Sequence, residues 1–133
     1  MKNWEADIQS FMSDALLGVG KLNDAWDSAM RAHVAYKRFG DRIGGAESAW
    51  GLGDIAVEMQ KCEDAERWYR EAANQAVLAN DPSSKLESYL RLGRFLMNCS
   101  RNSEAMFYLS EAKEIATNLN ENSMLEEIQQ LLR

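Results

Sequence analysis

Apolar residues recur at intervals of three and four positions along nearly every segment of the chain, a pattern typical of amphipathic helices. Glycine, asparagine and aspartate residues interrupt this pattern at several places, where they favour turns. The pattern predicts an all-α fold made of six longer helices and one short final helix. The predicted helices cover residues 4–19, 23–39, 42–60, 63–79, 84–98, 102–118 and 123–133.

Residues that favour helix ends mark several of these boundaries. Asn23 is a favoured N-cap, and Gly40 follows the end of the helix that Asn23 opens. Pro82 suits the first turn of a helix. Segments 84–87 and 123–126 read Ser-Lys-Leu-Glu and Ser-Met-Leu-Glu, which are capping boxes. The short last helix is apolar on one face, so we expect it to cap the last helix pair.

The chain contains an internal repeat of forty residues. Alanines recur at this interval, and columns fall into step when residues 6–45, 46–85 and 86–125 are stacked. Because one helix pair of this size cannot bury its apolar face alone, the three pairs are expected to stack as a single domain over residues 1–133. The matching columns are Met12/Leu52/Leu92, Ser13/Gly53/Gly93, Lys21/Lys61/Arg101, Asp24/Asp64/Glu104, Ala25/Ala65/Ala105, Ala32/Ala72/Ala112 and Asp41/Asp81/Glu121.

Small residues at fixed places in the repeat predict where two antiparallel helices approach closely. A side chain larger than alanine would force such helices apart. The expected close contacts are Gly53 with Ala65, Gly93 with Ala105 and Ser13 with Ala25. The remaining core columns are expected to be Met12, Leu16, Ala29 and Ala32 in the first pair, Leu52, Ala56, Tyr69 and Ala72 in the second, and Leu92, Leu96, Leu109 and Ala112 in the third.

Composition narrows the classes of partner. Fifteen basic residues against twenty-one acidic ones give a net charge of −6, which repels phosphate backbones, so we expect no nucleic-acid partner. No apolar run approaches the roughly eighteen residues of a membrane span, and the N-terminal segment lacks the apolar stretch of a signal peptide. The two cysteines are not in a paired motif, which favours a reducing compartment. We therefore expect a cytoplasmic protein with no membrane partner.

Residue patterns that support catalysis are missing. His33 is the only histidine, which leaves little for a histidine metal site or a catalytic triad, and we expect it on a helix surface or between repeats. Residues 51–53 lack the third glycine of a dinucleotide loop, and Ser48 is not at the centre of a nucleophile elbow. Cys62 and Cys99 resemble small buried residues at helix ends. We therefore expect no enzyme, no metal and no cofactor.

The repeat columns resemble those of the tetratricopeptide repeat (TPR) family over residues 6–125. That signature is a Leu-Gly pair in the first helix, an alanine a dozen residues later, a large apolar residue four beyond it, and a further alanine. The forty-residue period resembles the long variety found in G-protein-modulator adaptors. The residues that match are Leu52, Gly53, Ala65, Tyr69 and Ala72; Leu92, Gly93, Ala105, Leu109 and Ala112; and, less closely, Met12, Ser13, Ala25, Ala29 and Ala32.

The resemblance implies a right-handed α-solenoid of three hairpins whose first helices line a concave groove. Five of the implied groove residues are carboxylates and only Arg94 is basic, so the Lys and Asn clamp for a C-terminal carboxylate is absent. The implied ligand is a peptide or helix with Lys or Arg beside an apolar residue. The groove positions that the resemblance implies are Asp7, Ser10, Asp14, Leu17, Glu47, Trp50, Asp54, Val57, Glu87, Leu90, Arg94, Met97 and Asn98.

The predicted function is a non-enzymatic protein-binding adaptor, and three questions stay open in the sequence. Trp50 either anchors a partner or packs between helices, while Trp4, Trp26 and Trp68 are expected to pack or lie at edges. The acidic groove residues either bind a ligand or form a solvated face. The alternative function is a structural protein that self-associates as a homo-oligomer through the end faces of the stack.

Overall fold

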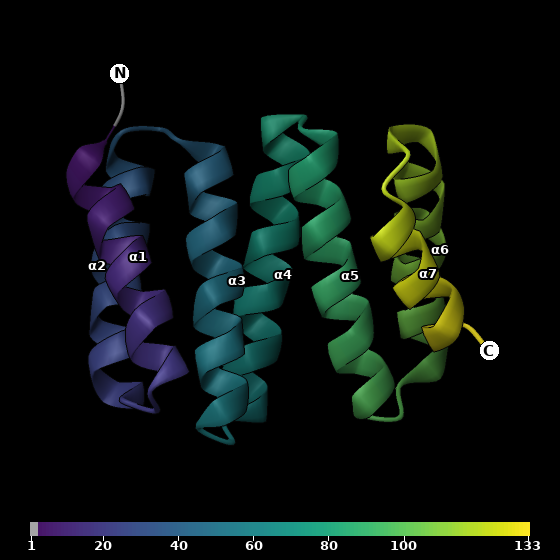
Figure 1. The fold of residues 1–133 in the computed structure, drawn as a ribbon, viewed down its shortest axis with the longest axis horizontal. Coiled ribbons are helices and arrows are strands. Elements are labelled where there is room, and N and C mark those ends of the chain that lie inside the picture. Colours follow the sequence, from purple (N-terminus) through teal and green to yellow (C-terminus); the bar gives the residue numbers. More distant parts are fainter. Residues whose placement is uncertain (1–2) are drawn as a thin grey trace.

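A computed structural model describes residues 3–133 as seven α-helices, and no strand occurs in that range. The prediction of an all-α chain is therefore confirmed for these residues. The helices stand in a row with the two termini at opposite ends (Figure 1). They are α1 (Trp4–Gly18), α2 (Leu22–Arg38), α3 (Arg42–Glu58), α4 (Cys62–Ala79), α5 (Pro82–Asn98), α6 (Asn102–Leu119) and α7 (Asn122–Leu131).

The helices form two layers. Each helix packs on the next one, and α1 also packs on α3, α3 on α5, and α5 on α7. Within the described residues, α2, α4 and α6 make no such close backbone contacts with one another. The odd-numbered helices therefore lie closer together, so the row curves toward them and they form its inner layer. None of the seven helices has the length and apolarity needed to cross a bilayer.

Every helix from α1 to α6 is followed by one residue in the left-handed conformation. At the end of α1, Lys21 N donates to Leu16 O at 2.9 Å and Gly20 N donates to Leu17 O at 3.1 Å, which is a Schellman motif. The residue in the left-handed conformation recurs every twenty residues, so one helix and its turn form half of the repeat. These residues are Gly20, Gly40, Gln60, Asn80, Ser100 and Asn120, with φ between 54° and 80°.

Aspartates cap two of the inner helices. The Asp41 side chain accepts from Gly44 N and the Asp81 side chain accepts from Ser84 N, both at 2.9 Å. Helix α5 therefore begins at Pro82, which lies in its first turn as predicted, whereas the predicted capping box at 84–87 is wrong. The other two predicted caps are also wrong: α2 begins at Leu22, after Lys21, and α7 begins at Asn122, after Glu121.

Gly53 and Gly93 lie where a large side chain of the partner helix packs against the backbone. A Cβ atom on Gly53 would lie 2.6 Å from the ring of Tyr69, and one on Gly93 would lie 2.7 Å from the Leu109 side chain. The nearest neighbours of both glycines are thus bulky residues one turn beyond the predicted alanines, and the predicted contact of Gly93 with Ala105 is also present, with Ala105 O 3.5 Å from the Cβ position of Gly93. The first pair confirms its predicted contact, since Ser13 Oγ donates to Ala25 O at 3.0 Å.

The predicted core is largely confirmed. Every predicted core residue from Ala29 onward is buried, including Tyr69 and Leu109. Met12 is the clear error, because its side chain is 47% exposed on the outward face of α1, and Leu16 is only half-buried. Trp26 and Trp68 meet edge to face at 6.2 Å between α2 and α4, so their predicted packing role is confirmed.

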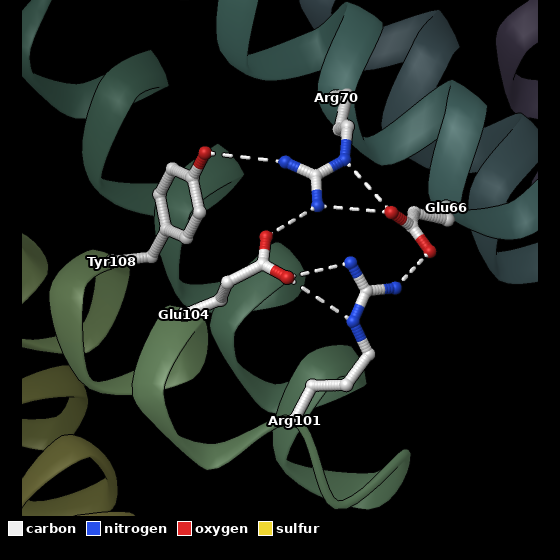
Figure 2. A network of polar contacts seen from close by, with 5 residues as sticks. All are labelled: Glu66, Arg70, Arg101, Glu104 and Tyr108. Atoms are coloured by element: carbon white, nitrogen blue, oxygen red, sulfur yellow. Dashed lines mark hydrogen bonds and ion pairs between the residues drawn. The ribbon is translucent and has the colours of Figure 1, made fainter.

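A network of charged side chains bridges α4 and α6 in the outer layer. Arg70 of α4 donates to Glu66 at 2.9 Å and to Glu104 of α6 at 2.8 Å. Arg101, at the start of α6, donates to Glu104 at 2.6 Å and also to Glu66, so each arginine lies between the same two glutamates (Figure 2). The hydroxyl of Tyr108 accepts a further bond from Arg70 at 3.3 Å. These contacts join the second and third repeats across the wider layer.

Candidate partner-binding groove

Two adjoining pockets open on the inner layer, and together they form the candidate groove. The smaller pocket has a volume of about 240 Å³ and the larger one about 670 Å³. Asp54 and Arg91 belong to both, so this pair separates them. The smaller pocket is also lined by Ser10, Ser13, Asp14, Ala29, Ala32, Glu47, Ser48, Trp50 and Gly51. The larger one is also lined by Leu17, Val57, Glu58, Cys62, Tyr69, Arg94, Phe95, Asn98 and Cys99.

Most of the implied groove residues line these pockets. Among the other four, Asp7 accepts a hydrogen bond from the Tyr36 hydroxyl at 2.6 Å and Glu87 pairs with Arg91. Met97 is half-buried against the core, and Leu90 is only 3% exposed, so Leu90 belongs to the core and offers no surface to a ligand. The residues brought together are Ser10, Asp14, Leu17, Glu47, Trp50, Asp54, Val57, Arg94 and Asn98.

Arg91 is the groove residue that the sequence interpretation missed. Its guanidinium pairs with Asp54 of the neighbouring helix and with Glu87, whose Oε1 lies 2.9 Å from Nη2. Burial lowers the pKa of Arg91, but the Asp54 and Glu87 carboxylates raise it further than burial lowers it. The Glu87–Arg91 spacing of four residues was the available signal, since such pairs meet on one helix face. Arg94 is likewise paired, with Glu127 at 2.7 Å.

Trp50 combines the two roles that the sequence left open. It is half-buried and packs against the main core cluster, yet it also lines the smaller pocket. The Arg91 guanidinium carbon lies 5.2 Å from the centroid of its ring, a cation–π contact. Trp50 thus helps to hold Arg91 in place, between Asp54 and Glu87.

Asp14 and Glu47 are the two carboxylates of the smaller pocket that form no ion pair within residues 3–133. No hydrogen bond or ion pair joins either carboxylate to another described residue. Burial raises the pKa of Asp14, which the charge of Asp54 raises further and that of Arg91 opposes. Burial also raises the pKa of Glu47, and the carboxylates of Asp41, Asp7 and Asp14 add to that effect. The smaller pocket therefore holds negative charge that the protein itself does not neutralise.

The hydroxyl of Tyr69 holds the groove carboxylate of Asp54 in place. Tyr69, the residue that Gly53 accommodates, donates its hydroxyl proton to Asp54 at 2.6 Å. Burial and the adjacent Asp54 charge raise the pKa of Tyr69, so the hydroxyl stays protonated and remains a donor. The close approach of α3 and α4 thereby sets the position of Asp54 between the two pockets.

The single histidine is buried between repeats, and the two cysteines line the larger pocket. His33 is buried between α2, α3 and α4, with Nδ1 2.8 Å from Ser48 Oγ, so its predicted place between repeats is confirmed. Ser48 Oγ donates to Gly45 O at 3.1 Å, so we assign the shared proton to Nδ1. Burial lowers the pKa of His33. Cys62 and Cys99 are both exposed, so the prediction that they are buried is wrong.

Comparison with known proteins adds no assignment. No protein-family model matches the chain, and no curated protein matches it. Within residues 3–133, no group of three or more His, Cys, Asp and Glu side chains is placed to hold a metal ion.

Proposed function

We propose that this chain is a short right-handed solenoid of the tetratricopeptide-repeat kind and acts as a non-enzymatic adaptor. Its inner layer binds a segment of another protein that carries Lys or Arg next to a large apolar residue. The forty-residue repeat, the two-layer order of the helices and the pockets between the odd-numbered helices support this proposal. A solenoid of this kind exposes one long surface, which suits an extended or helical ligand.

The observation that carries the proposal is the unpaired charge of Asp14 and Glu47. Both side chains are exposed, but their surroundings raise their pKa values, and neither forms a hydrogen bond or an ion pair with another described residue. A lysine or arginine side chain in the smaller pocket would supply charge-assisted hydrogen bonds to both. The ligand, rather than the fold, would then balance these two carboxylates.

The larger pocket suits the apolar part of the same ligand. Leu17, Val57 and Phe95 contribute apolar surface to it. The paired side chains of Asp54 and Arg91 separate this surface from Asp14 and Glu47, so a basic residue and an apolar residue of one segment would bind on either side of the pair. Because Asp54 is held by Tyr69 and Arg91, we assign it a role in positioning Arg91 rather than in direct recognition of the ligand.

A peptide library displayed on phage tests the proposal. We expect the wild type to enrich peptides that combine Lys or Arg with Leu, Phe or Trp, with affinity that falls as salt rises. A variant with Asp14→Asn and Glu47→Gln is expected to bind the enriched peptides at least 10-fold more weakly.

The matched control is Asp24→Asn with Glu114→Gln, which removes the same two charges from exposed positions outside both pockets. The control should bind like the wild type. Enrichment of acidic peptides, or equal losses in the control and the groove variant, would contradict the proposal. These neutral substitutions are preferable to a charge reversal at Asp54, which would also break its pair with Arg91.

A further inference from the structure

The outward face of α1 carries a continuous apolar surface, which we call the α1 stripe: Ile8, Phe11, Met12, Ala15 and Val19. All five are exposed, with Phe11 at 77% and Val19 at 71%. Their spacing places them on one side of the helix. That side is opposite the buried Ala6 and Ser13. Helix α1 is therefore apolar on two faces, a property of helices that are packed on both sides.

The repeat shows what this face does elsewhere in the chain. Forty residues on from Ile8, Met12 and Ala15 lie Ser48, Leu52 and Ile55 of α3, which are all buried. They pack on the preceding helix pair: Ser48 bonds to His33, and the other two join the cluster that contains Ala25 and Ala29. The equivalent residues of α5 are Ser88, Leu92 and Phe95, also buried, and the Phe95 ring lies 5.5 Å from that of Tyr69 in α4. Ile8, Met12 and Ala15 thus occupy the positions with which a repeat docks onto its neighbour, and Phe11 and Val19 extend the same exposed apolar surface.

The other end of the row is covered. Helix α7 packs on the last pair with Ile128, which is fully buried and lies 120 residues after Ile8 in the same column. Leu131 and Leu132, which continue the columns of Phe11 and Met12, also pack on the core. Head-to-tail stacking of two copies would therefore require removal of α7. Contact between two α1 stripes requires no rearrangement.

We propose that the α1 stripe packs against the α1 stripe of a second copy of this chain, with the two helices antiparallel about a two-fold axis. The inference goes beyond the proposed groove function. A two-fold contact needs a self-complementary surface. The stripe has one, because four of its five positions, Ile8, Phe11, Met12 and Ala15, are symmetric about the point between Phe11 and Met12. An antiparallel partner places Ile8 opposite the small Ala15, and Phe11 opposite Met12.

Charge favours this end of the molecule for contact between copies. The chain has a net charge of −6, but residues 1–40 contain five basic and five acidic residues and are neutral. The stripe itself contains no charged residue, so two copies meet here without the repulsion that their acidic middle repeats would cause. Asp14 lies on a different side of α1 and lines the groove, so the dimer keeps two open grooves.

Sedimentation velocity of the full chain tests the proposal. We expect the wild type to change with rising micromolar concentration from 15.1 kDa to twice that mass. Phe11→Asp is expected to weaken the dimer at least 10-fold while the helical circular dichroism is unchanged, because Phe11 is exposed. The matched control, Val77→Asp, alters a half-exposed residue on α4 outside the stripe and should dimerise like the wild type. The proposal is overturned if the wild type remains monomeric, in which case another protein would have to cover the stripe. It is also overturned if the wild type dimerises but Phe11→Asp does not weaken the dimer.

Cysteine cross-linking tests the antiparallel register. In a Cys62→Ser, Cys99→Ser background, which removes both exposed thiols, Ile8→Cys and Ala15→Cys are prepared as separate chains. We expect a disulfide-linked dimer when the two are mixed and oxidised, and much less from either alone. Cross-linking that is equally efficient in each chain alone would exclude the proposed register.

Discussion

Substituting alanine for Gly51 or Gly53 should have opposite effects, although both glycines lie in the middle of α3. A Cβ on Gly51 meets nothing within 4 Å, whereas one on Gly53 would lie 2.6 Å from the Tyr69 ring. Alanine at either site gains about 0.5–1 kcal/mol from its helix preference. At Gly53 the overpacking of α3 against α4 costs about 1–3 kcal/mol, since Tyr69 is buried and hydrogen-bonded to Asp54.

We therefore expect Gly51→Ala to raise the free energy of unfolding by about 0.5–1 kcal/mol and Gly53→Ala to lower it by about 0.5–2 kcal/mol. Urea titration followed by circular dichroism measures both values, and an unchanged m-value would show that the folded states have comparable compactness. In a Tyr69→Ala background the clash is absent, so Gly53→Ala should become stabilising. The natural combination of Ser13 with Ala29 in the first pair already avoids the clash in this way. Stabilisation of the wild type by both glycine substitutions would refute the proposed contact between α3 and α4.

Three further expectations concern strain and charge. Gln60→Gly and Ser100→Gly should each raise the free energy of unfolding by about 0.5–1 kcal/mol in urea titrations, since both residues have φ near 60°, and destabilisation would contradict this. Asp14→Asn with Glu47→Gln should raise the melting temperature at pH 7, because the folded state raises both pKa values and the ionised carboxylates therefore oppose folding at that pH. A lower melting temperature would contradict the absence of a stabilising partner for these carboxylates. The unfolded chain binds a proton at His33 more readily than the folded chain does, so the free energy of unfolding should fall as pH drops below about 6.5. A nuclear magnetic resonance titration that gives His33 a pKa above 6.5 in the folded protein would contradict this pH dependence.

Repetition made much of the fold predictable. Apolar spacing located all seven helices to within two residues at nearly every end, because each helix must bury one face and each turn needs a residue that tolerates its backbone. Three copies of one pattern also identified the small residues at the helix contacts. The contact of Gly53 with Tyr69 was missed because the column shows only that little space is available beside Gly53. The side chain that fills the space beside Gly53 is decided by the direction of the Tyr69 ring, which only the structure shows.

The candidate site was predictable only in part. Most of the implied positions line the two pockets, and the five carboxylates among the implied positions indicated an acidic surface, but more than half of the residues that line the pockets were not implied. Arg91 was missed because its main partner, Asp54, is 37 residues away in sequence and becomes a neighbour only when α3 packs on α5. As a result the acidity of the smaller pocket is concentrated at Asp14 and Glu47, while Asp54 is paired with Arg91.

The sequence by itself determined the helices, their turns, the forty-residue period and the apolar columns that bury them, because these follow from local backbone preferences and from which residues avoid water. Only the tertiary structure decided which charges pair across helices and which members of a column have a neighbour to pack on. Met12 and Leu52 share a column, yet Leu52 is buried and Met12 is exposed. The difference arises because Leu52 packs on α2 of the pair before it, whereas Met12 contacts no such helix pair among residues 3–133.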